Sequence, residues 1–199
     1  GFMNSKKKFI IIALVFVLIL AGAYVLYNKL SDGAAREQLA GQDENQNENG
    51  EEQTDNERHD EKTKAPDFAV YDEEGNKKGL SDYLGKPVII NFWASWCGPC
   101  KMEMPDFDKV YKELGDEIQF MMINLTDGSR ETKETAGAYI KEQGFSLPVF
   151  YDLDNEAVNI YGAYSIPMTF FIDEEGHLIA RATGAIDEQT LRKGIDMIK

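Results

Sequence analysis

Two cysteines separated by two residues are the part of this sequence best suited to chemistry. Cys97 and Cys100 are the only cysteines in the 199 residues, and they follow an apolar, β-branched run at 88–93 that predicts a strand. The segment after them predicts a helix, so Cys97 would lie at a helix N-terminus, where unpaired backbone N–H groups favour an anion. A thiolate is the species that attacks sulfur in thiol–disulfide exchange. The pair therefore predicts redox chemistry.

A structural zinc site and an inert disulfide are the alternatives. Zinc needs four ligands, usually two such pairs or one pair with two histidines. This chain has one pair, and its two histidines, His59 and His177, lie far apart in dissimilar settings. A structural disulfide that closes so short a loop would add modest stability and leave the flanking Trp96 and Pro99 unexplained. We therefore favour a catalytic dithiol, expect no metal site, and assign neither histidine a role.

An apolar segment near the N-terminus predicts a membrane span. Residues 9–27 are almost unbroken in apolar character, and as a helix they would span roughly 28 Å, about the thickness of a bilayer core. Three lysines at 6–8 place the N-terminus in the cytoplasm and the rest of the chain outside. A cleaved signal peptide is the alternative, because residues 21–23 have the small-x-small pattern of a signal-peptidase site. We expect residues 1–30 to be an uncleaved signal anchor that holds an extracytoplasmic domain at the cell membrane by a single pass.

Composition and charge divide the rest of the chain into a tether and a folded domain. Residues 31–64 are rich in Gln, Asn, Glu and Asp without an apolar period, which predicts a disordered acidic tether with an end-to-end distance of roughly 30–35 Å. Residues 1–30 contain four lysines and no acids, so the net charge of −14 becomes −18 for the remainder. That charge argues against nucleic acid as a partner, because phosphate contacts require clusters of Lys and Arg. Residues 65–199 are the expected folded domain.

Strand and helix signals alternate through residues 65–199. Strands are expected at 68–71, 88–92, 118–125, 148–151, 168–173 and 177–183. Helices are expected at 97–114, 131–144, 156–161 and 187–199. The turn at 174–176 predicts a hairpin between the last two strands. Alternating strands and helices, followed by a hairpin and a terminal helix, predict an α/β sandwich with a mixed sheet.

The motifs of this domain resemble those of the thioredoxin superfamily, in particular the membrane-tethered TlpA/ResA-like thiol–disulfide oxidoreductases. The strongest element is NFWASWCGPCK at 91–101, and the run APDF at 65–68 is similar to the usual opening of the domain. YSIPMTFFID at 164–173 resembles the cis-proline strand and the hairpin after it. Residues 126–163 match an extra strand and helix inserted in this branch. The resemblance implies a thioredoxin fold, a mixed central sheet flanked by helices, with this insertion and one preceding transmembrane helix.

The resemblance also assigns roles to residues. Cys97 corresponds to the nucleophile that attacks a substrate disulfide, and Cys100 to the resolving cysteine that releases the product. Pro167 matches a cis-proline that faces the dithiol. Substrate contact is expected from five residues around the pair: Trp96, Gly98, Pro99, Ile166 and Pro167. The redox-active disulfide Cys97–Cys100 would itself carry the electrons, without a separate cofactor.

The sequence departs from thioredoxin at one important position. Thioredoxin carries a buried aspartate in the strand before the cysteines, and this chain has Asn91 there. The membrane-tethered branch commonly carries a glutamate three residues after the second cysteine, where Glu103 stands. An i,i+3 spacing on a helix puts Glu103 on the same face as Cys100. Its carboxylate would accept the proton of Cys100 during resolution and raise the pKa of the thiols; an ordinary surface glutamate is the alternative.

The expected function is reduction of protein disulfides outside the cytoplasm. The Gly-Pro dipeptide between the cysteines is shared with thioredoxin, a reductant at about −270 mV. By resemblance, the partners are protein thiol or disulfide substrates, apocytochrome c cysteines among them, and a membrane thiol-transfer protein that donates electrons. Two alternatives stay open. A thiol peroxidase would need a Pro-x-x-x-Thr-x-x-Cys context, which residues 90–97 do not supply, and copper carriers of related fold use a three-residue cysteine spacing and a distal histidine, both absent here.

Two serine variants test the assignment of the cysteines. Cys97→Ser is expected to abolish thiol–disulfide exchange, because it removes the attacking thiolate. Cys100→Ser is expected to trap mixed disulfides, because no second thiol can displace the substrate, and nonreducing electrophoresis would detect them. Full activity of Cys97→Ser would show that the mechanism is wrong.

Overall fold

The computed structural model describes residues 20, 24, 39–41 and 63–199. The chain divides into two compact units, 1–37 and 38–199, and every strand among the described residues belongs to the second. Of the predicted membrane span, only Leu20 and Tyr24 are described, and both are helical; the rest of the span and most of the predicted tether lie outside the described residues. Within the described ranges, no helix is long and apolar enough to cross a bilayer.

In the second unit, the described residues form one eight-stranded mixed sheet in the order β1-β8-β7-β4-β5-β6-β2-β3. The strands are β1 (Leu39–Gly41), β2 (Val70–Tyr71), β3 (Lys77–Lys78), β4 (Val88–Trp93), β5 (Gln119–Asn124), β6 (Val149–Tyr151), β7 (Met168–Ile172) and β8 (Leu178–Thr183). The helices are the 3-10 helix η1 (Leu80–Tyr83), α2 (Gly98–Leu114), α3 (Lys133–Gln143), α4 (Glu156–Tyr161) and α5 (Glu188–Ile198). Strands β4, β5 and β6 pair in parallel, whereas β7 is antiparallel to β4 and β8.

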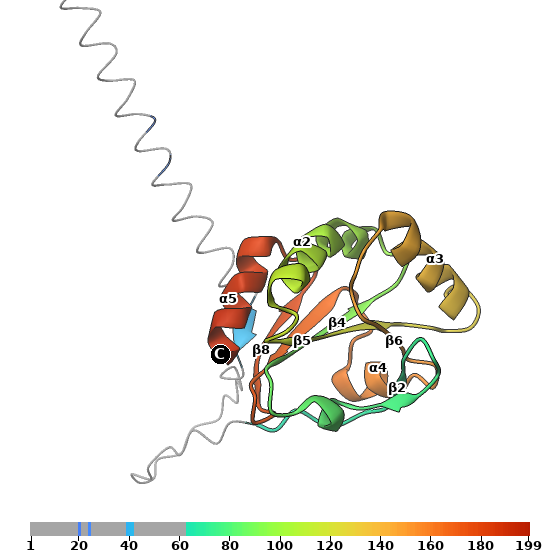
Figure 1. Ribbon diagram of the computed structural model, residues 1–199, viewed down its shortest axis with the longest axis horizontal. Coiled ribbons are helices and arrows are strands. Elements are labelled where there is room, and N and C mark those ends of the chain that lie inside the picture. The colour runs from blue at the N-terminus through green and yellow to red at the C-terminus, as the bar shows by residue number, and fades with distance from the viewer. Residues whose placement is uncertain (1–19, 21–23, 25–38, 42–62) are drawn as a thin grey trace, which may run out of the picture. The chain divides into compact units, whose positions relative to one another are not determined.

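Strand β4 lies inside the sheet and is buried along its whole length, as expected for a strand covered on both faces. Its side chains alternate between two cores. Ile89 and Trp93 pack with residues of α2, α3 and α5, whereas Ile90 and Phe92 pack with residues of α4 and η1. Figure 1 shows the same two layers, with α2, α3 and α5 on one side of the sheet and α4 on the other. Because side chains alternate along a strand, Asn91 falls on the α2 side.

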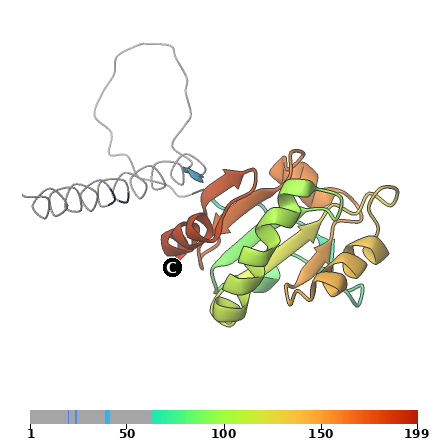
Figure 2. The same ribbon diagram turned by 90° about the horizontal axis from the view of Figure 1, so that it is seen from above.

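Helices α2 and α5 lie side by side on that face (Figure 2), joined by ion pairs Lys109–Glu188 and Arg192–Glu113. Helix α5 approaches β7 very closely. An ideal Cβ atom on Gly194 would lie 2.2 Å from Cε1 of Phe171, a distance that no carbon–carbon contact permits. A residue without a side chain is therefore needed where α5 crosses the aromatic ring.

The expected α/β class with a mixed sheet is confirmed, and most element boundaries agree within two residues. The helix expected at 97–114 begins at Gly98, with Cys97 as its N-cap. The helix expected at 131–144 begins at Lys133, because the Thr132 side chain accepts a hydrogen bond from Thr135 N and caps the helix. The short strand β3 and the helix η1 were not expected.

Strand β1 is a further difference, because it falls within the segment 31–64 that the sequence assigns to a tether. Its backbone pairs antiparallel with β8, Leu39 opposite Ala182, which makes β1 the edge strand. Thr63 and Lys64 also belong to the domain, since Thr63 O accepts from Leu178 N and Lys64 forms a bridge with His177. Pairing at a sheet edge uses backbone groups. It therefore does not require the alternating apolar side chains by which a strand is predicted from sequence.

Alanine at Gly194 is expected to destabilise the protein by about 1–3 kcal/mol, because the new methyl group overpacks the contact with Phe171. Gly137 is the matched control within helix α3, where an ideal Cβ would make only an ordinary 3.6 Å contact with Tyr151 Oη. Gly137→Ala is expected to be neutral or to stabilise by up to about 1 kcal/mol. Urea denaturation measures both; equal effects of the two variants would contradict the packing argument.

Candidate active site

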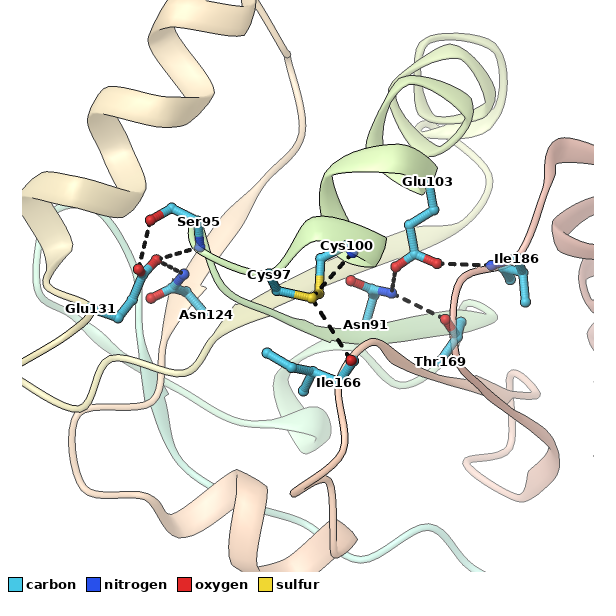
Figure 3. Close-up of a disulfide and its surroundings, with 10 residues drawn as sticks. All are labelled: Asn91, Ser95, Cys97, Cys100, Glu103, Asn124, Glu131, Ile166, Thr169 and Ile186. Atoms are coloured by element: carbon cyan, nitrogen blue, oxygen red, sulfur yellow. Dashed lines mark hydrogen bonds between the residues drawn. A yellow bond between two sulfur atoms is a disulfide. The ribbon is translucent and has the colours of Figure 1, made fainter.

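Cys97 and Cys100 form a disulfide at the N-terminus of helix α2, as Figure 3 shows. Cys97 is the N-cap, and its Sγ accepts a hydrogen bond of 3.2 Å from Cys100 N. Cys97 keeps 4% of its surface exposed, whereas Cys100 has none. A backbone donor at a helix N-terminus also stabilises a thiolate on the same sulfur. The more accessible cysteine is therefore also the one whose sulfur lies where the helix N-terminus favours a negative charge.

The loop before β7 faces this disulfide. The Ile166–Pro167 peptide bond is cis, as the resemblance predicts. The carbonyl oxygen of Ile166 lies 3.8 Å from Cys97 Sγ, and Pro167 O accepts a hydrogen bond from Gly184 N, which ties the loop to the end of β8. The fold thus brings residues almost 70 positions apart into one site, because β7 pairs directly with β4.

Glu103 lies in the second turn of α2 and is 2% exposed, so the alternative of an ordinary surface glutamate is wrong. Its Oε1 accepts a hydrogen bond of 2.8 Å from Asn91 Nδ2, and its Oε2 accepts one of 3.0 Å from Ile186 N. Burial raises the pKa of Glu103 from 4.5 to about 7, against the opposing effect of the hydrogen bonds from Ile186 and Asn91. Both oxygens are directed to these partners and not to Cys100 (Figure 3).

The expected substrate-contact residues surround the disulfide, and only Pro167 among them is buried. Gly98 and Pro99 are exposed, and Ile166 is half-buried. Trp96 is 39% exposed, and the guanidinium carbon of Arg130 lies 3.7 Å from the centroid of its ring. That stacking is a cation–π contact. It places a positive charge over the ring of the residue that precedes Cys97, in a chain that is acidic overall.

Sequence analysis missed Glu131, which is fully buried beside the active-site turn. Its Oε1 accepts hydrogen bonds from Ser95 N at 2.8 Å and Asn124 Nδ2 at 2.7 Å, and its Oε2 accepts one from Ser95 Oγ at 2.6 Å. Ser95 lies two residues before Cys97, so the carboxylate fixes the turn between β4 and α2. The sequence offered no signal for this role, because Glu131 is simply the first residue of the helix expected at 131–144.

A second group of titratable side chains lies at the hairpin between β7 and β8. Ligand atoms of Asp173, Glu175 and His177 lie within 4.8 Å of one another. His177 N and its ring Nδ1 both contact Asp173 Oδ1, at 2.8 and 3.1 Å. These contacts close the hairpin and account for the grouping, so we assign it no chemistry.

The mixed sheet, the disulfide at the start of α2 and the cis-proline opposite it define a thioredoxin-like thiol–disulfide oxidoreductase. Comparison with known proteins agrees with this class. The chain belongs to the AhpC/TSA family, whose model matches residues 62–181. It is 29% identical to the thiol-disulfide oxidoreductase ResA of Bacillus subtilis over 199 residues, which cover 99% of this chain and 97% of ResA.

Two further comparisons support the assignment. The ResA of Geobacillus thermodenitrificans is 33% identical over 138 residues, which cover 68% of this chain and 76% of that protein. The crystal structure of the pneumococcal exposed lipoprotein thioredoxin Etrx1 from Streptococcus pneumoniae is 31% identical, with a TM-score of 0.55 over 66% of this chain and 98% of that one. The chain is therefore a thiol–disulfide oxidoreductase of the ResA type.

Glu103→Gln tests the burial of the carboxyl group through the pH dependence of stability. Because folding raises this pKa from 4.5 to about 7, the native state holds a proton that the unfolded chain releases between these pH values. The stability that this bound proton contributes is fully present below pH 4.5. It is lost as pH rises from 4.5 through 7, by about 3 kcal/mol in total. Glutamine stays neutral, so the variant should gain about this free energy of unfolding relative to the parent between pH 4.5 and 8.

Urea denaturation of the oxidised proteins measures this difference. Glu117→Gln is the control: Glu117 is an exposed glutamate whose pKa is lowered by the hydrogen bond and charge of Lys199. As pH rises, the free energy of unfolding of Glu117→Gln should not increase relative to that of the parent. If the free energies of unfolding of Glu103→Gln and the parent change in parallel between pH 4.5 and 8, Glu103 does not titrate in this range.

Proposed function

We propose that the protein is a membrane-anchored, extracytoplasmic reductase of protein disulfides. The observation that carries the proposal is the Cys97–Cys100 disulfide, in which the sulfur of the more accessible cysteine lies 3.8 Å from the carbonyl oxygen before the cis-proline. A substrate disulfide that approaches Cys97 meets the α2 N-terminus and the cis-proline loop together. We infer that Trp96, Gly98, Pro99, Ile166 and Pro167 form the surface that the substrate contacts.

In the first step, the Cys97 thiolate attacks one sulfur of the substrate disulfide. A bond forms between Cys97 and that sulfur, the substrate S–S bond breaks, and the departing substrate thiolate takes up a proton. The N–H groups at the start of α2 favour the attacking thiolate. The product is a mixed disulfide between Cys97 and the substrate.

In the second step, Cys100 loses its proton and attacks Cys97 Sγ. The Cys97–Cys100 disulfide forms, the mixed disulfide breaks, and the second substrate sulfur leaves as a thiolate that is then protonated. Two electrons and two protons pass to the substrate in all. Glu103 is the group we assign to receive the proton of Cys100 during resolution, because a carboxyl group with a pKa near 7 exchanges protons readily at neutral pH. In the disulfide form its oxygens accept from Asn91 and Ile186, so this step requires one of them to turn toward Cys100.

The reductive direction and the partners rest on the sequence. The Gly98-Pro99 dipeptide is that of thioredoxin, and a reductase needs a supply of electrons. We propose a membrane thiol-transfer protein as the donor that restores the dithiol, and protein disulfides, including those of apocytochrome c, as substrates. The similarity to ResA supports exchange with protein substrates.

The proposed location rests on the N-terminal sequence. The apolar run at 9–27 with its preceding lysines predicts a single span with the N-terminus in the cytoplasm. The match to the Bacillus subtilis ResA extends over 99% of this chain, so it includes this segment. Etrx1, which shares the fold, is described as an exposed lipoprotein. These observations support a catalytic domain outside the cytoplasm.

The reduction potential of the Cys97–Cys100 couple tests the direction. The full chain in detergent is equilibrated with glutathione or dithiothreitol buffers, and the fraction of disulfide is measured; Cys97→Ser, which cannot form the bond, is the blank. We expect a value near or below the roughly −270 mV of thioredoxin, and a value near the roughly −120 mV of DsbA would make the protein an oxidase or isomerase.

Two further measurements address the alternatives. Turnover of hydrogen peroxide that requires Cys97 alone would favour the peroxidase. Stable stoichiometric binding of Cu(I) without disulfide reductase activity would favour the copper chaperone. Under the proposed function, peroxide turnover is negligible, and disulfide reduction requires both Cys97 and Cys100.

A further inference from the structure

Asn91 has a buried amide oxygen that lacks a partner. Asn91 has no exposed surface, and its Oδ1 accepts no hydrogen bond within the described part of the chain. Burying a carbonyl oxygen without a donor costs free energy, so nearly all such groups in proteins are paired. Figure 3 shows this oxygen on the side of Asn91 that faces the Cys97–Cys100 disulfide, while the amide nitrogen faces Glu103 and Thr169.

The orientation of the amide follows from its nitrogen. Asn91 Nδ2 donates to Glu103 Oε1 at 2.8 Å and to Thr169 Oγ1 at 3.1 Å. Above its pKa of about 7, Glu103 is an ionised carboxylate that can only accept hydrogen bonds, so in that state it requires the amide nitrogen on its side. The oxygen is then left facing the disulfide, where neither sulfur carries a hydrogen atom.

We propose that the amide oxygen of Asn91 accepts a hydrogen bond from the Cys100 thiol once the disulfide is reduced. Reduction breaks the S–S bond, adds two electrons and two protons, and gives Cys100 an S–H group. Cys100 is fully buried, so that S–H needs a protein acceptor. Of the two buried side-chain nitrogen and oxygen atoms without a partner in the described residues, Asn91 Oδ1 is an acceptor, whereas Trp93 Nε1 is a donor.

This assignment makes Asn91 a positioning residue between Glu103 and Cys100. A negative charge on Glu103 polarises the Asn91 amide through its N–H and strengthens the oxygen as an acceptor. The carboxyl group therefore acts on the resolving thiol through Asn91, although both of its own oxygens point elsewhere. The hydrogen bond exists only in the dithiol form, so it favours that form and holds the Cys100 proton until resolution. This inference rests on the proposed role of Cys100 as the resolving thiol.

The infrared S–H stretching band of Cys100 tests the hydrogen bond directly. In the full chain in detergent, Cys97→Ser leaves Cys100 as the only thiol, so the band is unambiguous. We expect the band at the lower frequency of a hydrogen-bonded thiol, and at the higher frequency of a free thiol when Asn91→Leu is added. Ile90→Val is the control on the same strand, because its side chain lies in the opposite core, and it should leave the band unmoved.

A free-thiol band in Cys97→Ser alone would overturn the proposal, and so would a band that Asn91→Leu does not shift. If the leucine variant does not fold, Asn91→Ala removes the same amide without added bulk. Because this readout requires no substrate and no direction of electron flow, it can succeed or fail independently of the proposed reductase function.

The equilibrium with glutathione supplies a second readout that a purely structural role would not move. With both cysteines present, Asn91→Leu should shift the equilibrium toward the disulfide by about two- to tenfold, the value of one ordinary hydrogen bond. Ile90→Val should not shift it. A structural residue would stabilise the oxidised and reduced forms alike, so an unchanged equilibrium in Asn91→Leu would contradict the proposal.

Discussion

The burial of β4 between two cores is the constraint on which the site depends. Because both faces of this strand are covered, its side chains are divided strictly between the layer under α2 and the layer over α4. Asn91 is thereby directed under the active-site helix, and the strand ends just before the turn that carries Cys97. The same strand pairs with β7, and the register of that pairing places the cis-proline loop beside the disulfide.

Two buried carboxyl groups flank the disulfide and have different tasks (Figure 3). Glu131 accepts three hydrogen bonds from Ser95 and Asn124 and holds the turn before Cys97. Glu103 accepts from one side-chain amide and one backbone amide, and its burial moves its pKa into the neutral range. One group therefore fixes geometry, while the other is available for protons. Both carboxyl groups are buried, one on either side of the disulfide (Figure 3).

Much of the fold and the reactive pair could be predicted from the sequence, for identifiable reasons. The apolar run of β4 and the spacing of Cys97 and Cys100 are local patterns. The cis bond at Pro167 was predicted from the resemblance of residues 164–173 to a known family motif. What could not be predicted depends on contacts between elements. Glu131 has no local mark that separates it from a surface residue, and the bond from Asn91 to Glu103 joins a strand to a helix. β1 pairs with β8 through its backbone, and backbone pairing leaves no mark in the composition.

The hydrogen bonds of Glu131 have a consequence for transplanting this site. The residue belongs to the segment 126–163, which the resemblance marks as an addition to the thioredoxin core, yet its carboxylate holds Ser95 in the reactive motif itself. Segment 126–163 thus supports the active-site turn through the hydrogen bonds of Glu131 to Ser95. A chimera that received the motif WCGPC without this segment would inherit the two sulfurs but not the support that fixes their approach to α2.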